Sequence, residues 1–537
     1  MEFLLNIVIY LPLLGVLAIL LMKEGPAVKW TSFIATSATF LLSLPLLMNF
    51  DITSSALPQF VTEGSPILET MDVKYLVGLD GLSLLLFMLT TLMGPIVILS
   101  SWNSVTKSIK GYYAMLLILQ TASLGTFAAL DLVVFYVFFE LSLIPMYFLI
   151  GIWGGSGRIQ ATVKFFIYTL VGSLIMLVAL LYLGFHAGAA TGVYEFTADW
   201  RFIAGPDYTI GLVEQTYMFL AFALAFCIKV PLFPFHTWLP YAHTEAPTAG
   251  SVVLAAIMLK LGTYGLLRIC MPVFPNAFME FAPWMAGLAV IGIIYGALVA
   301  MVQKDVKKLV AYSSVSHLGF VVLGIFAFNT IAVQGAIIQM VNHGLSTGAL
   351  FLIVGMIYDR RHTRMIEDFG GIARSVPVLA VMFMIATLAS IGLPGLNGFI
   401  GEFFILLGSY NSVLYDNITF AVLAATGVIL AAVYMLWMYQ RVMFGPLEKE
   451  ENKAMLDLNA REVSLLIPLV VFMIWIGVRP VDFTVYSEGW TENYISTSED
   501  KSVAVLKQAN FENLPDWTAA IYYKEESELE SQFVTRD

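Results

Sequence analysis

The sequence predicts an all-α polytopic membrane protein with about 14 transmembrane helices, ten of them arranged as two inverted five-helix repeats. Hydrophobic residues make up 59% of the 537 positions, charged residues only 12%, and the mean hydropathy is +0.84. These values lie far outside the range of soluble globular proteins. Apolar runs of about 20 residues, the length that crosses a bilayer, recur fourteen times. Two of these runs are long and interrupted by proline or glycine, which is typical of transporters.

The N-terminal segment, residues 1–110, is predicted to hold the first three spans. It carries an acidic residue, Glu2, directly after Met1 and lacks both a basic leader and a small-residue cleavage site, so we expect its first run to be retained as a membrane helix. The fourteen spans are expected near residues 3–22, 30–49, 79–101, 112–130, 132–152, 162–186, 211–242, 248–270, 281–302, 306–328, 331–358, 376–408, 418–442 and 463–480.

Residues 111–270 and 279–443 are each predicted to form a five-helix repeat, comprising spans four to eight and nine to thirteen. Proline removes a backbone donor and clashes with the preceding turn, so a span that contains it should break. Helix breaks are therefore expected in the seventh and twelfth spans, at Pro231, Pro234, Pro394 and Gly395. The breaks lie five spans apart, and because five is odd, the two repeats have opposite orientation in the membrane.

The basic residues predict the orientation of the chain. Most of the 27 lysines and arginines lie in alternate loops beginning with the first, and such loops are usually cytoplasmic. An even number of spans then places both termini on the outer, periplasmic side of a bacterial cytoplasmic membrane. After the last span, residues 463–480, the segment 481–537 holds twelve acidic and four basic residues and no apolar run. We expect it to form a separate acidic tail outside the membrane.

Two lysines, Lys229 and Lys260, lie within apolar runs where no loop accommodates them. A charged side chain in the bilayer centre costs several kcal/mol, so such residues usually face the protein interior and carry function. Glu140 lies in the fifth span, and we expect it to pair with Lys229. Moving the carboxylate towards or away from the ammonium would switch the lysine between holding and releasing a proton. The alternatives are permanent structural ion pairs for the lysines and, for Glu140, a carboxyl group that reaches the headgroups or stays protonated.

Three further ionisable residues lie in spans of the second repeat. His317 and His343 fall in the tenth and eleventh spans, and Glu402 follows the second helix break. Histidine is suited to a proton relay because its ordinary pKa lies near 6.5. Glu402 is the last ionisable group before the outer side and is therefore the expected exit residue. The alternatives are hydrogen-bonded core histidines and a carboxyl group that caps the second half of the broken helix.

His236 and His243 are expected at the cytoplasmic mouth of the first broken span. They are seven residues apart, but a zinc site needs further ligands and only Glu245 is near, so no metal is expected. The two cysteines both lie in apolar runs and are too few for an iron–sulfur cluster. We expect no cofactor in this chain and no nucleic-acid partner.

Four stretches together carry a family resemblance: IKVPLFPFHTWLPYAHTEAPTAGSVVLAAIMLKLGTYGLLR, KDVKKLVAYSSVSHLGFV, QMVNHGLSTGALFLIVGMIYDRRHTR and GLPGLNGFIGEF. The sequence resembles the antiporter-like, proton-translocating membrane subunits of respiratory complex I over most of residues 75–445. In this family the L-like and N-like subunits carry a lysine on the twelfth span, so Glu402 favours the remaining subunit type.

The resemblance implies a role for each matching residue. Glu140 and Lys229 would form the essential pair, Lys260 the central connector, His317 and His343 the relay, and Glu402 the outer terminal site. The chain would move protons outward beside L-like and N-like neighbours, while NADH, FMN, iron–sulfur clusters and quinone would lie in partner subunits. Two other functions use the same motifs: a subunit of a multisubunit cation/proton antiporter and a subunit of a membrane-bound hydrogenase.

Overall fold

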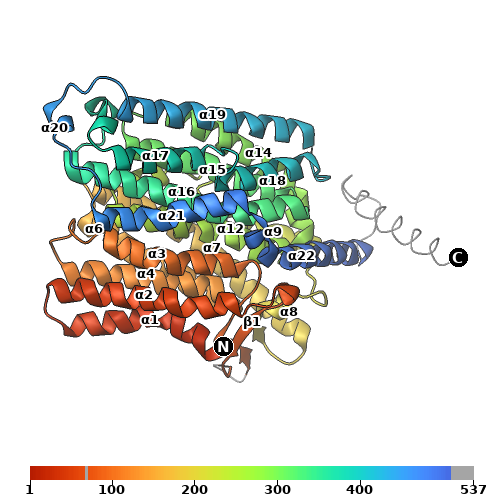
Figure 1. Cartoon of the computed structure of the whole chain (residues 1–537). Helices are drawn as coiled ribbons and strands as arrows, with labels where there is room; N and C mark the ends of the chain where they lie inside the picture. The colour runs from red at the N-terminus through yellow and green to blue at the C-terminus, as the bar shows by residue number, and fades with distance from the viewer. Residues whose placement is uncertain (67–69, 416, 509–537) are drawn as a thin grey trace.

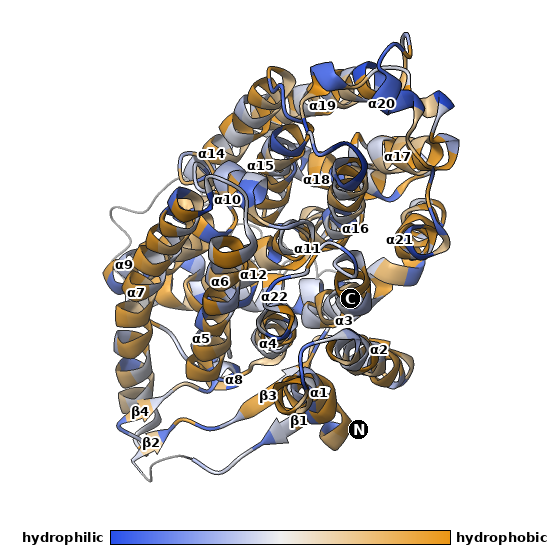
Figure 2. Ribbon diagram, turned by 90° about the vertical axis from the view of Figure 1, so that its left-hand side faces the viewer, coloured by the Kyte–Doolittle hydropathy of each residue, from blue (hydrophilic) through white to orange (hydrophobic). Residues whose placement is uncertain are grey.

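The structure is a computed structural model that describes residues 1–66, 70–415 and 417–508. Its long helices lie side by side in one bundle (Figure 1), and Figure 2 views the bundle from one end. Below, the end of the bundle that carries Met1 is called the outer end and the opposite one the inner end. Twelve helical segments within the described residues are long and apolar enough to cross a membrane. The predicted all-α membrane fold is confirmed.

The N-terminal segment supplies three spans and a small outer structure. The spans are α1 (Glu2–Leu21), α2 (Pro26–Met48) and α3 (Ser83–Ser100). Between α2 and α3 the chain forms the short helix η1 (Ile52–Ser54) and three strands, β1 (Gln59–Glu63), β2 (Met71–Asp72) and β3 (Leu76–Leu79). Strand β1 pairs antiparallel with β3, and β2 pairs parallel with β4 (Phe196–Thr197). These strands tie the outer loops of spans that lie far apart in the sequence.

The first predicted repeat begins at α4 and ends at α13. Its helices are α4 (Ile109–Ala128), α5 (Leu132–Leu141), α6 (Leu143–Trp153), α7 (Arg158–Thr191), the short outer helix α8 (Trp200–Ile203), α9 (Leu212–Lys229) and α10 (Leu239–Glu245). The eighth span is a continuous run of α11 (Thr248–Val253), η2 (Leu254–Met258), α12 (Leu259–Gly265), η3 (Leu266–Cys270) and α13 (Met271–Val273), in which η2 and η3 are π-helical.

The second predicted repeat is followed by two C-terminal helices. Its spans are α14 (Pro275–Met301), α15 (Val306–Phe326), α16 (Thr330–Arg361), the pair α17 (Pro377–Ser390) and α18 (Asn397–Tyr410), and α19 (Asn417–Met443). Short helices η4 (Ile366–Asp368), η5 (Ile372–Arg374) and α20 (Glu450–Lys453) lie in the inner loops, and α21 (Ala460–Val478) and α22 (Val481–Gln508) complete the described chain. Adding α4 and the pair α17 and α18 to the twelve candidate spans gives the fourteen predicted crossings.

Both predicted helix breaks are confirmed. The seventh span stops at Lys229 and resumes at Leu239, and the twelfth stops at Ser390 and resumes at Asn397. The fifth span contains an additional interruption that the sequence analysis did not predict. Ser142 separates α5 from α6, because Pro145 has no backbone N–H to bond the carbonyl four residues earlier.

The most buried spans occupy the centre of the bundle. The apolar windows of the eighth and eleventh spans are fully buried and that of α15 is 94% buried, whereas those of α2, α19 and α21 are only 33% buried. The predominantly hydrophobic helices α1, α7 and α19 lie at the periphery in Figure 2. The three central spans carry Lys260, His317 and His343, so the ionisable side chains lie where lipid cannot reach them.

The acidic segment after the last span is not a separate unit over residues 481–508. These residues form α22, which packs across the outer end of the bundle. Lys501 donates hydrogen bonds to the carbonyls of Ile203 (3.1 Å) and Pro272 (2.9 Å), and the amide of Asn276 donates to Ser502. Burial lowers the pKa of Lys501 to about 7. The remainder of the predicted tail, residues 509–537, lies outside the described part of the chain.

Candidate functional site: a row of buried ionisable side chains

Lys229 lies at the end of the half-helix α9, beside the first helix break. Its side chain is buried, its ammonium lies 3.3 Å from the hydroxyl oxygen of Ser142, and it lies 4.7 Å from the centre of the Phe139 ring. The break leaves the carbonyl of Ile228 without a helical partner, and the indole N–H of Trp238 donates to it at 2.9 Å. Irregular backbone at membrane depth needs such partners, so the break is held open by specific contacts.

Glu140 and Lys229 lie on neighbouring helices but do not form a direct ion pair within 4 Å in the described structure. Glu140 lies at the end of α5 and is only half-buried. Ser142, two residues further on, contacts the ammonium instead. The pairing of Glu140 with Lys229 stays a prediction, and the kink between α5 and α6 lies directly beside it.

Lys260 lies at the centre of the bundle between the two π-helical segments. It is completely buried, it donates a hydrogen bond to the carbonyl of Ala255, and its ammonium nitrogen lies 2.7 Å from Nδ1 of His343. The carbonyl of Ala255 belongs to η2, where the i to i+5 pattern changes the helical bonding. At 2.7 Å the two nitrogens are within hydrogen-bonding distance of each other.

The end of α9 is packed directly against the helix of Lys260. A Cβ atom at Gly262 would lie 2.7 Å from the carbonyl oxygen of Phe226 and 2.9 Å from the backbone nitrogen of Val230. Only a residue without a side chain permits this approach. The first broken helix therefore touches the central span one turn from Lys229.

His317 and Glu402 extend the contact from His343. The rings of His343 and His317 lie 6.1 Å apart, and Nδ1 of His317 lies 3.1 Å from a carboxylate oxygen of Glu402. Both side chains are almost completely buried. Lys260, His343, His317 and Glu402, from α12, α16, α15 and α18, form what we call the lateral row. Each member lies on a different helix, so the row crosses the bundle sideways.

Neutral polar groups hold the far end of the lateral row in place. The Gln339 amide donates to the same Glu402 oxygen at 3.3 Å, and the Tyr434 hydroxyl lies 3.4 Å from Nε2 of His317. The side-chain amides of Asn342 and Asn397 each donate to the other residue's carbonyl, at 2.8 and 3.2 Å. This reciprocal pair fastens the start of α18 to α16. Tyr434 was missed because a tyrosine in an apolar span carries no signal of its partner.

The structure does not place His236 and His243 at an opening. His243 is completely buried, its ring is stacked on Phe351 at 4.5 Å, and neither of its ring nitrogens has a described partner. His236 is 3% exposed and lies against Phe233 and Tyr295. The assignment of these two histidines to a cytoplasmic mouth stays a prediction. Within the described residues, no group of three metal-binding side chains was found.

An opening lies at the inner end of the bundle, beside the end of α10, the helix that carries His243. It is a pocket of ≈ 410 Å³ whose lining includes Glu245, Lys307 and Arg364. Lys307 is 6% exposed and donates to the carbonyl of Ala246 at 2.6 Å. Lys307 is the second residue of α15, at the end of an apolar run, so no local pattern indicates its burial. Asp305 caps this helix and accepts hydrogen bonds from the backbone N–H groups of Lys307 and Lys308.

Arg268, in η3, is also buried. Its guanidinium forms two parallel hydrogen bonds with Asp80, at 2.6 and 2.7 Å, and a third with the hydroxyl of Tyr264 at 2.8 Å. The Asp80 side chain is 0% exposed and that of Arg268 2% exposed. The indole N–H of Trp200 donates to the carbonyl of Arg268. This pair fastens the start of α3 to the central eighth span.

A second charge cluster lies on the outer strands. Lys74 forms ion pairs with Glu63 (2.7 Å), Asp72 (3.2 Å) and Asp199 (3.3 Å), and Arg201 pairs with Glu63 and Asp199. Burial opposes the charge on Lys74, but its hydrogen bonds to Glu63 and Asp72 outweigh burial and raise its pKa. The cluster fastens together the outer loops that precede the third and seventh spans.

Known proteins share this sequence and arrangement. Residues 129–471 match the family described as "NADH:quinone oxidoreductase/Mrp antiporter, TM". The chain is 47% identical over 491 residues to NADH-quinone oxidoreductase subunit M of Rhodobacter capsulatus, covering 89% of this chain and 94% of that protein.

Solved structures have the same fold. A chain of respiratory complex I from Thermus thermophilus with bound NADH superposes with a TM-score of 0.82 at 32% identity, covering 93% of this chain and 99% of that one. A chain of the Mrp complex from Dietzia sp. DQ12-45-1b has a TM-score of 0.76 at 18% identity, covering 93% and 99%. At that identity the second likeness extends to the fold alone.

Proposed function

The chain belongs to the family of NADH:quinone oxidoreductase and Mrp antiporter membrane subunits, and from this premise we propose that it carries protons along the lateral row. It is a multi-pass membrane protein and a membrane-arm subunit of a proton-translocating NADH:quinone oxidoreductase, of the subunit M type. Its role is to move protons across the membrane while redox chemistry proceeds elsewhere in the complex.

The observation that carries the proposal is the contact between Lys260, His343, His317 and Glu402 in the most buried part of the bundle. Four ionisable side chains in a dry core are costly unless each has a partner. Here each lies beside the next, at 2.7 Å, at 6.1 Å between rings, and at 3.1 Å. Charge interactions are strong in such surroundings, so a proton arriving at one end changes the proton affinity of the next residue.

We assign uptake to the inner end. The pocket beside Lys307 opens there, and the buried ring of His243, with two unpartnered nitrogens, lies on the half-helix α10 that borders it. A proton would pass from this pocket to Lys260. Lys229 and Glu140 form a second, adjoining site, which controls the first through the contact between α9 and Gly262.

Release is assigned to Glu402. It lies on α18, the half-helix that runs from the second break to the outer end, and one of its carboxylate oxygens has no described partner. Gly392 has a φ of 71° in the break, and a Cβ there would lie 2.8 Å from that same oxygen. The free oxygen therefore faces the break, where water can reach non-helical backbone.

The complex supplies what this chain does not. We propose that NADH, FMN, the iron–sulfur clusters and quinone bind in partner subunits, and that L-like and N-like subunits flank this one. We further propose a bacterial cytoplasmic membrane with both termini on the periplasmic side. The outer end of the bundle carries both Met1 and α22, which agrees with an even number of spans.

A cation/proton antiporter subunit is the second candidate, because the Mrp chain has the same fold. A membrane-bound hydrogenase subunit is the third. Purification of the native complex distinguishes them. Companion subunits with FMN and iron–sulfur clusters that oxidise NADH support the first function, whereas companions that are all antiporter subunits, or a hydrogenase catalytic subunit, support the others.

The lateral row is tested with Lys260→Met in the whole complex reconstituted into proteoliposomes. The variant removes the ammonium but keeps the length of the side chain, and NADH-driven acidification should be lost while the complex still assembles. The matched control is Thr263→Val, one turn along the same helix, where the hydroxyl donates to the Lys260 carbonyl at 3.1 Å. Full proton pumping in an assembled Lys260→Met complex would refute the row.

A further inference from the structure

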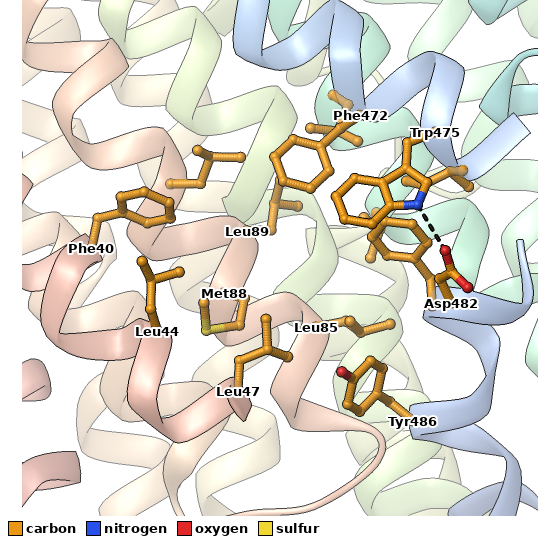
Figure 3. A pocket seen from close by; sticks show the side chains of 15 residues that line it. Phe40, Leu44, Leu47, Leu85, Met88, Leu89, Phe472, Trp475, Asp482 and Tyr486 are labelled. Atoms are coloured by element: carbon orange, nitrogen blue, oxygen red, sulfur yellow. Dashed lines mark hydrogen bonds between the residues drawn. The ribbon is translucent and has the colours of Figure 1, made fainter. Parts of the chain in front are cut away.

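An apolar pocket lies behind the lateral row, between helices from both ends of the sequence. It has a volume of ≈ 560 Å³ and is lined by residues of α2, α3, α16, α21 and α22 (Figure 3). That volume lies within the range of small-molecule sites, about 300–1,000 Å³. Among its lining residues only Asp482 is charged. The pocket holds none of the ionisable residues assigned to proton transfer.

The body of the pocket suits an unbranched hydrocarbon chain. Phe40 and Leu44 of α2 face Phe472 of α21 across the pocket, with Met88 and Leu89 of α3 between them (Figure 3). No polar group lies in this part of the lining, so nothing there would bind a polar ligand. A chain that enters from the bilayer leaves one apolar environment for another, so van der Waals packing against these side chains would hold it.

The mouth of the pocket carries polar groups at one side. The indole N–H of Trp475 donates to Asp482 at 2.8 Å, as Figure 3 shows, and Tyr486 lies nearby. Arg479 pairs with the other carboxylate oxygen of Asp482 at 3.1 Å, yet its side chain is 71% exposed. An arginine has five N–H donors, so it keeps donors for a second anion. Tryptophan and tyrosine are enriched at the headgroup level of membranes.

The surroundings of the pocket face lipid. Leu41 and Leu42, on the turn of α2 that precedes Leu44, are 61% and 37% exposed, and only a third of the α2 window is buried. A water-soluble ligand would have to cross this apolar surface. A lipid already in the bilayer enters sideways.

We propose that this pocket is a phospholipid site, in which one acyl chain fills the space between α2, α3, α16 and α21 and an anionic headgroup pairs with Arg479. The phosphate oxygens accept hydrogen bonds from the exposed N–H groups of the guanidinium, a geometry that favours two parallel bonds. Trp475 and Asp482 hold the arginine at the mouth. The binding does not depend on the proposed path of the protons.

The bound chain would form part of the wall behind the lateral row. Val341 and Leu345 line the pocket and lie two residues to either side of His343 on α16. Ile476, also in the lining, precedes Gly477, where a Cβ would lie 2.4 Å from the carbonyl oxygen of Gly395 in the second break. The acyl chain thus lies behind His343 and beside the second helix break.

The test is photo-crosslinking of the whole complex in nanodiscs that contain phosphatidylglycerol with a diazirine on its acyl chain. Two variants of α2 are matched: Leu44→Trp fills the pocket, whereas Leu41→Trp adds the same bulk to the exposed face. Labelling of the peptide that spans residues 472–486 should fall about tenfold in Leu44→Trp, equivalent to about 1.4 kcal/mol, and stay unchanged in Leu41→Trp. Equal labelling in the wild type and Leu44→Trp would overturn the site.

Two further measurements distinguish other occupants. Arg479→Gln should remove the preference for phosphatidylglycerol over a phosphatidylcholine probe, and an unchanged preference would overturn the headgroup assignment. If peptides 472–486 instead crosslink to a neighbouring subunit, or are labelled no more than the exposed face of α2, the pocket is an interface or ordinary lipid-facing surface and the proposal fails.

Discussion

The buried pair of Asp80 and Arg268 offers the sharpest test of how the bundle is held together. Arg268→Met removes the guanidinium and leaves a completely buried carboxylate without its two hydrogen bonds of 2.6 and 2.7 Å. Removing one partner of such a buried pair lowers the unfolding free energy by about 3–5 kcal/mol. Asp80→Asn should cost a similar amount, because it leaves the arginine unpaired while its side-chain oxygen still accepts from the backbone N–H of Ser83, as Asp80 does at 3.1 Å.

The double variant separates charge from packing. With Arg268→Met and Asp80→Asn together, no buried charge is left unpaired. The double variant should therefore lose no more unfolding free energy than either single variant. The assay is unfolding of the purified chain in mixed micelles, followed by tryptophan fluorescence, since the guanidinium lies 4.5 Å from the Trp200 ring. If each single variant lowered the unfolding free energy by less than about 1 kcal/mol, the size expected of an exposed ion pair, the reasoning would be refuted. It would also be refuted if the double variant lost as much unfolding free energy as the two single variants added together.

Three further outcomes are expected. Tyr434→Phe should slow NADH-driven proton pumping roughly two- to tenfold without loss of assembly, because a hydrogen bond to His317 contributes about 0.5–1.5 kcal/mol; an unchanged pumping rate would exclude a role for the hydroxyl. Burial raises the pKa of Asp131 to about 6, so the folded state binds the proton more tightly than the unfolded state and loses stability as the pH rises from about 4 to 6. Asp131→Asn removes that loss, and its unfolding free energy should exceed that of the wild type more at pH 8 than at pH 4; an equal difference at both pH values would contradict this. Gly477→Ala should destabilise the chain by about 1–3 kcal/mol, because the added Cβ would lie too close to the backbone carbonyl of Gly395 in the second break. Gly287→Ala should be tolerated, because the nearest atom to its Cβ would be 3.9 Å away. Equal thermal stability of the two variants would show that the backbone of the break shifts to accept the methyl group.

Much of the fold could be predicted from one sequence because the bilayer imposes a length on every apolar run. Helices such as α15 and α21 begin within a few residues of the predicted spans. The two breaks were predictable because proline removes a donor wherever it lies. The kink at Ser142 was missed although Pro145 carries the same signal. The π-helical segments around Lys260 were not predictable, since they depend on how the helices pack.

The candidate site was predictable in its members and only partly in its contacts. Hydrophobic context singled out Lys229, Lys260 and Glu402, because a charge in an apolar run is costly anywhere. It did not single out Lys307 and Arg268, which lie near the ends of apolar runs. Their burial is decided by neighbouring helices that extend beyond them, which no local pattern reveals.

By itself, the sequence determined that the chain crosses the membrane many times and which side chains would be out of place there, because both follow from the free energy of moving single residues from water into lipid. Only the tertiary structure decided which of those side chains meet. Lys260 and His343 are 83 positions apart, and His317 and Glu402 are 85 apart. Their contacts arise from the packing of α12, α15, α16 and α18, and such packing is a property of the whole bundle.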